Sequence, residues 1–173
     1  MNLKKIKIGI LGGSFDPAHN GHLKISKEAI KQLKLKKVIW AITKKNPFKK
    51  KSKTSLSQRI NYCKRIIGKT NSISVKFYED KIKSHKTITL INHVLKNNKY
   101  EIYFLMGADN LINFHKWHKW KIISEKCKII VFDRTGYKKK SLNSVAFKRI
   151  ARENLTFIKF DKVNISSSKL RNI

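Results

Sequence analysis

The sequence has few cysteines, prolines and glycines, and it has no long run of apolar residues. Its 173 residues include two cysteines, two prolines and seven glycines. Cys63 and Cys127 lie far apart and outside any Cys-x-x-Cys spacing, which predicts two reduced thiols rather than a disulfide framework. No apolar run approaches the roughly 18 residues of a membrane-spanning helix, and the first residues lead into a strand pattern rather than a signal peptide. We therefore expect a cytoplasmic protein with no membrane partner.

Acidic residues are also scarce. The 10 aspartates and glutamates are outnumbered by 41 lysines and arginines, which gives a net charge of +31 and is compatible with a nucleic-acid partner. Only six of these cations are arginines, the better groove readers, and the lysines are spread over the whole chain. Lysine, isoleucine and asparagine make up 73 of the 173 residues. All three have A/T-rich codons, so a bias in genome base composition explains the charge without a polyanion. In either case the positive field attracts small anions such as nucleotides.

What the sequence does contain is a regular alternation of strand and helix patterns. It is 40% hydrophobic, which is enough for one domain over residues 1–173 with its own core. Strand patterns lie at residues 6–11, 38–43, 73–78, 101–106, 128–133 and 156–160. Helical patterns lie at residues 22–33, 55–67, 87–95 and 144–153, and short helices are expected across 110–124. Ser55 and Thr87 are expected to be N-caps, with loops at 79–86 and 135–140. The alternation predicts an α/β fold, a Rossmann-like, mostly parallel sheet with helices on both faces.

A glycine-rich loop joins the first strand to the first helix. Gly12 and Gly13 are expected to let the backbone turn sharply and approach a ligand closely. The start of the following helix favours an anion. His19 and His22 stand three residues apart at this place, and they share one face if the chain is already helical there. No cysteine or carboxylate completes a metal site with them, so no protein-bound metal is predicted.

The run Gly12-Gly13-Ser14-Phe15-Asp16-Pro17-x-His19-x-Gly21-His22-Leu23 resembles the signature of the nucleotidyltransferase superfamily. It is most similar to that of the bacterial nicotinate-nucleotide adenylyltransferases. The resemblance implies adenylyl transfer from ATP to nicotinate mononucleotide, which yields deamido-NAD and pyrophosphate, with Mg²⁺ bound through ATP. The catalytic residues that it implies are His19, His22, Lys49 and Arg171. For ATP binding it implies Gly12, Gly13, Ser14, Phe15, His22, Gly107, Asp109, Ser167, Ser168 and Arg171.

Two of these positions follow the fourth predicted strand. Gly107 ends that strand, and Asp109 is well placed to accept hydrogen bonds from ribose hydroxyls. The alternative is that Asp109 only caps the next helix. The ends of the first and fourth strands would form one site if these strands are neighbours, because ligands bind where the strand order reverses. Arg59 resembles a further family position, and the alternative for it is a helix-surface arginine.

The second substrate would be held by Lys86, Thr87, Trp117 and His118, again by resemblance. Trp117 matches the family tryptophan that stacks on the nicotinate ring, whereas Trp120 is expected to anchor short helices in the core. His118 stands where tyrosine is usual. Lys86 stands where a threonine grips the nicotinate carboxylate, with Thr87 one place on. The preference between acid and amide mononucleotide therefore stays open.

Two alternatives remain at this stage. One lies within the fold, a pantetheine-phosphate or nicotinamide-nucleotide adenylyltransferase. The other is a basic nucleic-acid-binding module, although the chain lacks an arginine-rich groove-reading helix and any RNA-stacking motif. The expected partners are ATP and nicotinate mononucleotide, with no specific nucleic acid, for a monomer or homodimer.

Overall fold

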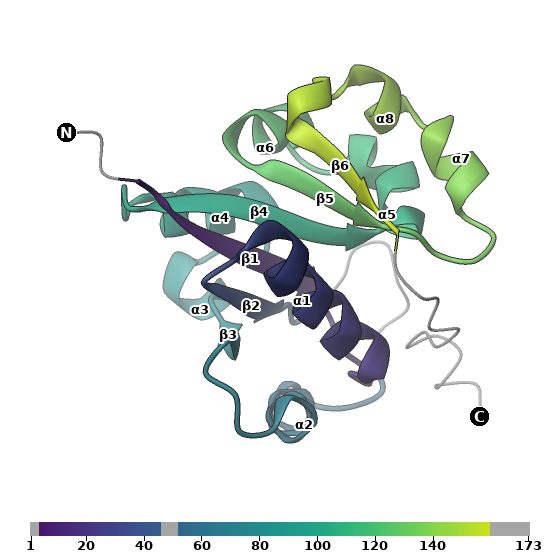
Figure 1. Ribbon diagram of the computed structural model, residues 1–173. Coiled ribbons are helices and arrows are strands. Elements are labelled where there is room, and N and C mark those ends of the chain that lie inside the picture. Colours follow the sequence, from purple (N-terminus) through teal and green to yellow (C-terminus); the bar gives the residue numbers. More distant parts are fainter. Residues whose placement is uncertain (1–3, 46–51, 160–173) are drawn as a thin grey trace.

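The computed structural model describes residues 4–45 and 52–159, and it confirms the predicted α/β alternation (Figure 1). The strands are β1 (Ile6–Gly13), β2 (Lys37–Ile42), β3 (Ile73–Phe77), β4 (Tyr100–Gly107), β5 (Lys128–Phe132) and β6 (Leu155–Ile158). The helices are α1 (Asn20–Leu33), α2 (Leu56–Ile67), α3 (Glu79–Ile82), α4 (Thr87–Leu95), α5 (Ala108–Asn113), α6 (Trp120–Lys126), α7 (Lys138–Leu142) and α8 (Val145–Arg149). Two 3₁₀ turns are η1 (Phe114–Lys116) and η2 (Arg152–Asn154). In the described ranges, we find no helix long and apolar enough to cross a membrane.

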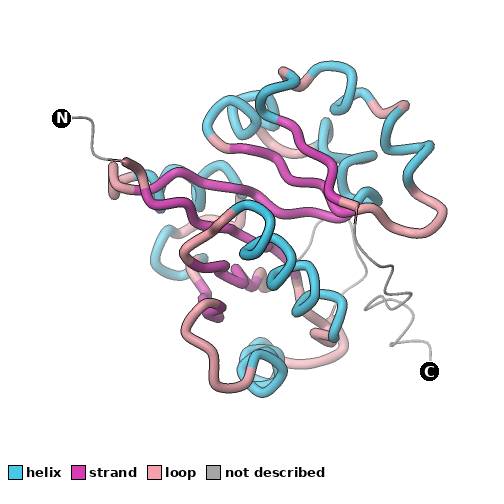
Figure 2. Tube along the Cα trace, viewed as in Figure 1, coloured by secondary structure: helices cyan, strands magenta, loops and turns pink. Residues whose placement is uncertain are grey.

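The six strands form one sheet in the order β3-β2-β1-β4-β5-β6, and every pairing is parallel. Parallel strands end at the same edge, so the loops after β1, β2 and β5 and the start of α5 after β4 lie along one side of the molecule (Figure 2). The strand order reverses between β1 and β4, which are directly paired. The condition set by the sequence, that the first and fourth strands be neighbours, is therefore met.

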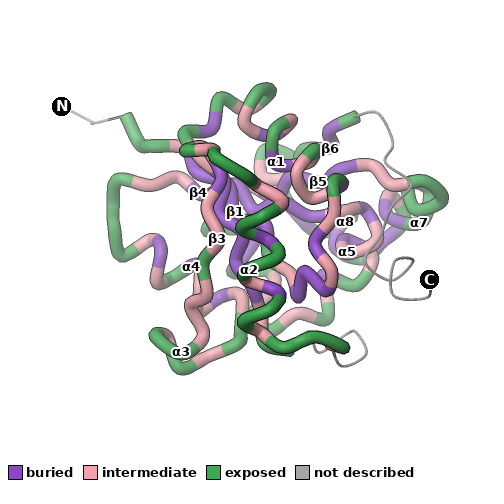
Figure 3. The backbone as a smooth tube through the Cα atoms, turned by 90° about the horizontal axis from the view of Figure 1, so that it is seen from below, coloured by how far each residue is buried: buried purple, intermediate pink, exposed green. Residues whose placement is uncertain are grey.

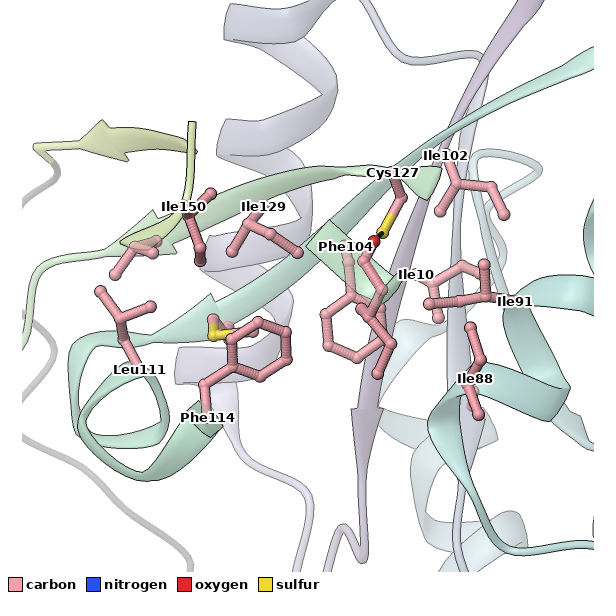
Figure 4. Close-up of a cluster of buried hydrophobic side chains, with 14 of the residues drawn as sticks. Ile10, Ile88, Ile91, Ile102, Phe104, Leu111, Phe114, Cys127, Ile129 and Ile150 are labelled. Atoms are coloured by element: carbon pink, nitrogen blue, oxygen red, sulfur yellow. Dashed lines mark hydrogen bonds between the residues drawn. The ribbon is translucent and has the colours of Figure 1, made fainter. Parts of the chain in front are cut away.

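Both faces of the sheet are buried, as Figure 3 shows for the central strands. Alternate residues of β4 point to opposite faces: Phe104 and Met106 join one core cluster, and Tyr103 and Leu105 join the other. Helices α4, α5, α6 and α8 cover the first cluster, part of which is shown in Figure 4, and α1 and α2 cover the second. Each fully buried aliphatic or aromatic side chain contributes roughly 1.5–3 kcal/mol, so the two clusters hold the strand ends that carry the site.

Both cysteines are buried free thiols, one in each core cluster. Burial raises the pKa of Cys63 and of Cys127 to about 12. The thiolate is the nucleophilic form of cysteine, and this form is suppressed at both positions. The cysteines therefore serve as core residues, as expected.

Some predicted boundaries were wrong. The expected loops at 79–86 and 135–140 contain the short helices α3 and α7. The helix expected over 144–153 ends at Arg149, whereas the short helices expected across 110–124 are present as α5, η1 and α6. Ser55 is an N-cap as predicted, since its Oγ accepts from the Gln58 N–H at 3.2 Å. Thr87 is not, because it is the first residue of α4 and Lys86 occupies the cap position.

Candidate active site

The loop after β1 ends at the first turn of α1, and its two histidines cap that helix. His19 is the N-cap residue, with φ −152° and ψ 169°, and its Nδ1 accepts the Gly21 N–H at 3.1 Å. His22 Nδ1 accepts the His19 N–H at 3.1 Å, so the two imidazoles form a reciprocal capping box. The ring centroids lie 3.9 Å apart. Because each Nδ1 is an acceptor, the proton of each neutral ring resides on Nε2. Both rings are therefore set up to donate a hydrogen bond from Nε2.

The glycines before this loop do not form the sharp turn that we expected. Gly12 and Gly13 are the last residues of β1 and pair in register with Ala41 and Ile42 of β2. Neither has a positive φ. The left-handed conformation falls instead on Phe15, with φ 48°. The chain turns later than predicted because the parallel ladder with β2 continues to the second glycine.

Buried side chains contact the ring and the backbone of His22. The Phe15 ring lies 4.8 Å from the His22 ring and stacks on Trp40 at 5.0 Å and 13°. Trp40 is fully buried, and its Nε1–H donates to Ser26 Oγ at 2.8 Å. The Ser26 hydroxyl in turn donates to the His22 carbonyl at 2.8 Å. Sequence reasoning did not select Trp40 or Ser26. The only signal was that Ser26 stands four residues after His22 on a helix.

Two buried charged side chains tie this loop to its neighbours. Asp16 is 1% exposed and accepts the Lys53 N–H at 2.8 Å and the Thr54 hydroxyl at 2.6 Å. Arg59 is 4% exposed and donates to the Ser14 carbonyl at 2.6 Å. The alternative of a helix-surface arginine is therefore wrong.

Asp109 lies in the first turn of α5, at the end of β4. Its Oδ2 accepts from the Arg134 guanidinium at 2.6 Å, whereas its Oδ1 is buried and has no hydrogen-bond partner among the described residues. Asp109 is not the N-cap of α5, because Gly107 occupies that position, and no described side chain caps this helix. A Cβ on Gly107 would lie 2.5 Å from Asp109 Oδ1, so glycine leaves room for this carboxylate. Arg134, which follows β5, was not predicted. An unpaired buried acceptor is unusual and suits a ligand that brings a hydroxyl.

Trp117 ends the 3₁₀ turn η1 and is partly exposed. Its ring packs edge-on against Phe104, with centroids 6.0 Å apart at 90°, and against Phe114 at 5.2 Å and 70°. Trp120 also packs against Phe114, at 6.1 Å, as expected for a core anchor. The two buried phenylalanines therefore fix the Trp117 ring while part of it stays accessible.

Lys86 and His118 are both exposed and lie close enough to interact. The pKa of His118 is lowered by desolvation and then by the positive charges of Lys86 and Lys119. Thr87 follows Lys86 at the start of α4, whose first turn has no side-chain cap. The four residues predicted for the second substrate thus include a close pair, Lys86 and His118. Four other predicted residues, Lys49, Ser167, Ser168 and Arg171, lie outside the described part of the chain and stay predictions.

Comparisons with known proteins identify the family of this chain. The profile of the cytidylyltransferase-like family matches residues 10–173. The chain is 65% identical to a probable nicotinate-nucleotide adenylyltransferase of Pelagibacter ubique, over all of this chain and 96% of that protein. It is 33% identical to a protein of the same name from Clostridium tetani, over 95% of this chain and 85% of that one. The structure resembles a Plasmodium falciparum nicotinic acid mononucleotide adenylyltransferase complexed with NaAD, with a TM-score of 0.76, 22% identity, and coverage of 96% and 83%. The chain therefore belongs to the nicotinate-nucleotide adenylyltransferase family, within the cytidylyltransferase-like proteins.

Proposed function

We propose that this protein transfers the adenylyl group of ATP to nicotinate mononucleotide, forming deamido-NAD and pyrophosphate. The observation that carries the proposal is the histidine capping box at the end of β1, next to β4. Its hydrogen bonds occupy both Nδ1 atoms and leave Nε2 as the proton-bearing nitrogen of each ring. Two such donors, at a helix N-terminus that attracts anions, suit a reaction between two phosphate groups. Family membership supports the same activity.

In the proposed reaction a phosphate oxygen of nicotinate mononucleotide attacks the α-phosphorus of ATP. The bond from that phosphorus to the bridging β-phosphate oxygen breaks, and pyrophosphate leaves. The attacking group is already an anion, so no covalent enzyme intermediate is required. Catalysis then consists of in-line placement and stabilisation of the developing charge. His22 and His19 donate to phosphate oxygens, and Lys49 and Arg171 are proposed to add positive charge.

The nucleoside of ATP is proposed to lie over the ends of β4 and β5. Asp109 Oδ1 is the acceptor for a ribose hydroxyl, because it is buried and unpaired. Arg134 holds the other carboxylate oxygen and thereby orients Asp109. Gly107 permits the close approach of this carboxylate to the strand end.

Mg²⁺ would arrive with ATP. Among residues 4–45 and 52–159 no group of three or more histidine, cysteine or carboxylate side chains is arranged to hold a metal ion. Both oxygens of Asp16 and one of Asp109 already accept hydrogen bonds. Mg²⁺ prefers oxygen ligands and commonly binds through substrate phosphates and water. The donor set therefore fits a metal held by the nucleotide, whose charge would help to neutralise the phosphates.

The nicotinate ring is proposed to stack on Trp117, with its carboxylate toward Lys86, Thr87 and His118. Lysine in place of the usual threonine adds a positive charge, which favours a carboxylate over a carboxamide. We infer that this protein prefers the acid mononucleotide. Its preference would rest on charge more than on a hydroxyl contact.

Purified protein with ATP and Mg²⁺ tests the proposal when it is supplied separately with nicotinate mononucleotide, nicotinamide mononucleotide and phosphopantetheine. We expect pyrophosphate release to be fastest with nicotinate mononucleotide, and equimolar deamido-NAD to form. Release only with phosphopantetheine, or faster release with the amide, would contradict the proposed substrate.

A further inference from the structure

Arg59 lies on α2 and joins the ends of two neighbouring strands. One guanidinium nitrogen donates to the carbonyls of Ser14, at 2.6 Å, and Thr43, at 2.8 Å. The other terminal nitrogen donates to the Lys44 carbonyl at 3.2 Å. Ser14 follows β1, and Thr43 and Lys44 follow β2. A single side chain therefore sets the spacing between the two loops at the edge that carries the site.

Two carboxylates complete this arrangement. Asp16 holds the backbone of Lys53 and the hydroxyl of Thr54. Glu79 accepts from the Thr43 hydroxyl and from the Lys44 N–H. Both oppose the effect of burial, which lowers the pKa of the Arg59 guanidinium. Arg59, Asp16 and Glu79 thus hold three segments together. One segment follows β1, one follows β2, and one precedes α2.

A buried arginine is an unfavourable choice if its only role is to stabilise the fold. Arg59 is 4% exposed, and within residues 4–45 and 52–159 its Nε has no hydrogen-bond partner. Removing a guanidinium from water is unfavourable, and apolar residues often replace buried ion pairs without loss of stability. What an apolar residue cannot do is bridge three carbonyls in a fixed geometry, which the planar fork of arginine does.

The carbonyl held by Arg59 lies one residue before Phe15. The Phe15 ring packs against His22, at 4.8 Å, and against Trp40. A shift of Ser14 therefore moves the turn that supports the proposed phosphate donors. Misplacement of about 1 Å can cost a reaction on the order of 100-fold.

We propose that Arg59 is a positioning residue for the transfer reaction, which fixes the loop after β1 against the end of β2 without touching substrate. The inference rests on the proposed function and adds a residue that acts through the loop. It predicts an effect on kcat more than on KM, because ATP and the mononucleotide keep their own contacts.

Three variants test it in the pyrophosphate assay: Arg59→Lys, Arg59→Ala and the control Arg65→Ala. Arg65 is exposed on the same helix, and its guanidinium lies over the Tyr62 ring. We expect Arg59→Lys to stay folded but to lose about 10- to 100-fold in kcat, with KM values changed less than about 3-fold. We expect methylguanidinium to restore part of the kcat of Arg59→Ala by filling the vacated site, and to leave the wild type and Arg65→Ala unchanged.

Wild-type turnover is the reference in each assay. An inactive wild type would contradict the proposed function, whereas an active wild type with an equally active Arg59→Lys would contradict the positioning role. A loss of activity that only follows the folded fraction, measured by circular dichroism, and is not relieved by methylguanidinium would also contradict it. Arg59→Lys keeps the test decisive if Arg59→Ala does not fold.

Discussion

At the edge of the sheet that carries the candidate site, the polar side chains of one half are hydrogen-bonded more completely than those of the other half. In the half that contains β1, β2 and β3, two acidic side chains are fully paired: Asp16, after β1, and Glu79, after β3, each accept two hydrogen bonds from neighbouring segments. After β4 and β5 pairing is incomplete. Among the described residues, Asp109 keeps one buried oxygen without a hydrogen-bond partner, and His118, which lies between β4 and β5, is exposed.

The difference separates two tasks. A group that must stabilise a transition state is most effective when its position is set before the substrate arrives, because no reorganisation is then required. The half built on β1 and β2 meets this condition. Phe15 packs against the His22 ring, and Ser26 donates to the His22 carbonyl. A group that recognises a substrate needs an unused acceptor or charge. The half built on β4 and β5 leaves such groups available, so we expect mutations in the first half to lower kcat and mutations in the second to raise KM.

The largest effect is expected at His22. Replacing His22 by Asn keeps an acceptor near the position of Nδ1 for the His19 N–H but removes the Nε2 donor. We expect kcat to fall about 100- to 1000-fold, as for loss of one transition-state donor, with little change in thermal unfolding. His93→Asn on α4, whose ring packs against Tyr78, is the control. Turnover by His22→Asn within about 3-fold of wild type would remove His22 from the proposed mechanism.

The next effect concerns Asp109 in the open half. Asp109→Asn keeps the shape of the side chain but loses the charge that pairs with Arg134 and accepts from a ribose. Because a charged hydrogen bond contributes about 1.5–3 kcal/mol, we expect the KM for ATP to rise about 10- to 100-fold while kcat changes little. Steady-state kinetics with varied ATP measure this, with exposed Glu125→Gln as control. A fall in kcat at unchanged KM would erase the proposed distinction between the two halves.

A smaller effect is expected for the choice between acid and amide. Lys86→Met removes the charge proposed to meet the nicotinate carboxylate. We expect the KM for nicotinate mononucleotide to rise about 10-fold, equivalent to about 1.4 kcal/mol, and the KM for nicotinamide mononucleotide to change much less. Exposed Lys81→Met on α3 is the matched control. An unchanged ratio of the two KM values would show that Lys86 does not read the carboxylate.

The smallest effect is a dependence on pH. The pKa of His118 is lowered by desolvation and by the charges of Lys86 and Lys119, so His118 gains its proton at a lower pH than an ordinary histidine. Its charge would then add to that of Lys86. We expect the KM for the acid, relative to that for the amide, to fall a few-fold from about pH 7.5 to about pH 5.5 in the wild type.

Two variants sharpen this pH test. His118→Gln should abolish the trend. Lys86→Met should move it to higher pH, because removing a neighbouring positive charge raises the pKa of His118. If the same pH dependence of the KM ratio persists in His118→Gln, another titrating group is responsible for it.

Long apolar patterns predicted the fold well, and short polar ones did not. Each of the six expected strands and the helices α1, α2 and α4 is present, because their spacing already encodes which side is buried. Helices α3 and α7 were missed. They are only four and five residues long, and α7 is mostly lysine, so neither has an apolar stripe to read. Such short helices depend on tertiary contacts.

The sequence selected the motif residues of the candidate site but not the residues that pack behind them. Residues 12–23, Gly107, Asp109 and Trp117 were selected because their order matches a family signature. Arg134 and Trp40 were not, since a buried ion pair or indole contact between distant segments leaves no local pattern. Arg59 was selected only by resemblance, although it lies three residues after Leu56 and four before Cys63, on the same face of the helix.

The sequence by itself determined the alternation of strands and helices and the chemical groups that each strand end presents. Those properties are local, because they depend on residue type and spacing. Only the tertiary structure decided that β1 lies beside β4, that His19 and His22 use their Nδ1 atoms as caps, and that Asp109 keeps a free buried oxygen. These properties depend on which distant segments meet, and that is settled by packing both faces of one sheet at the same time.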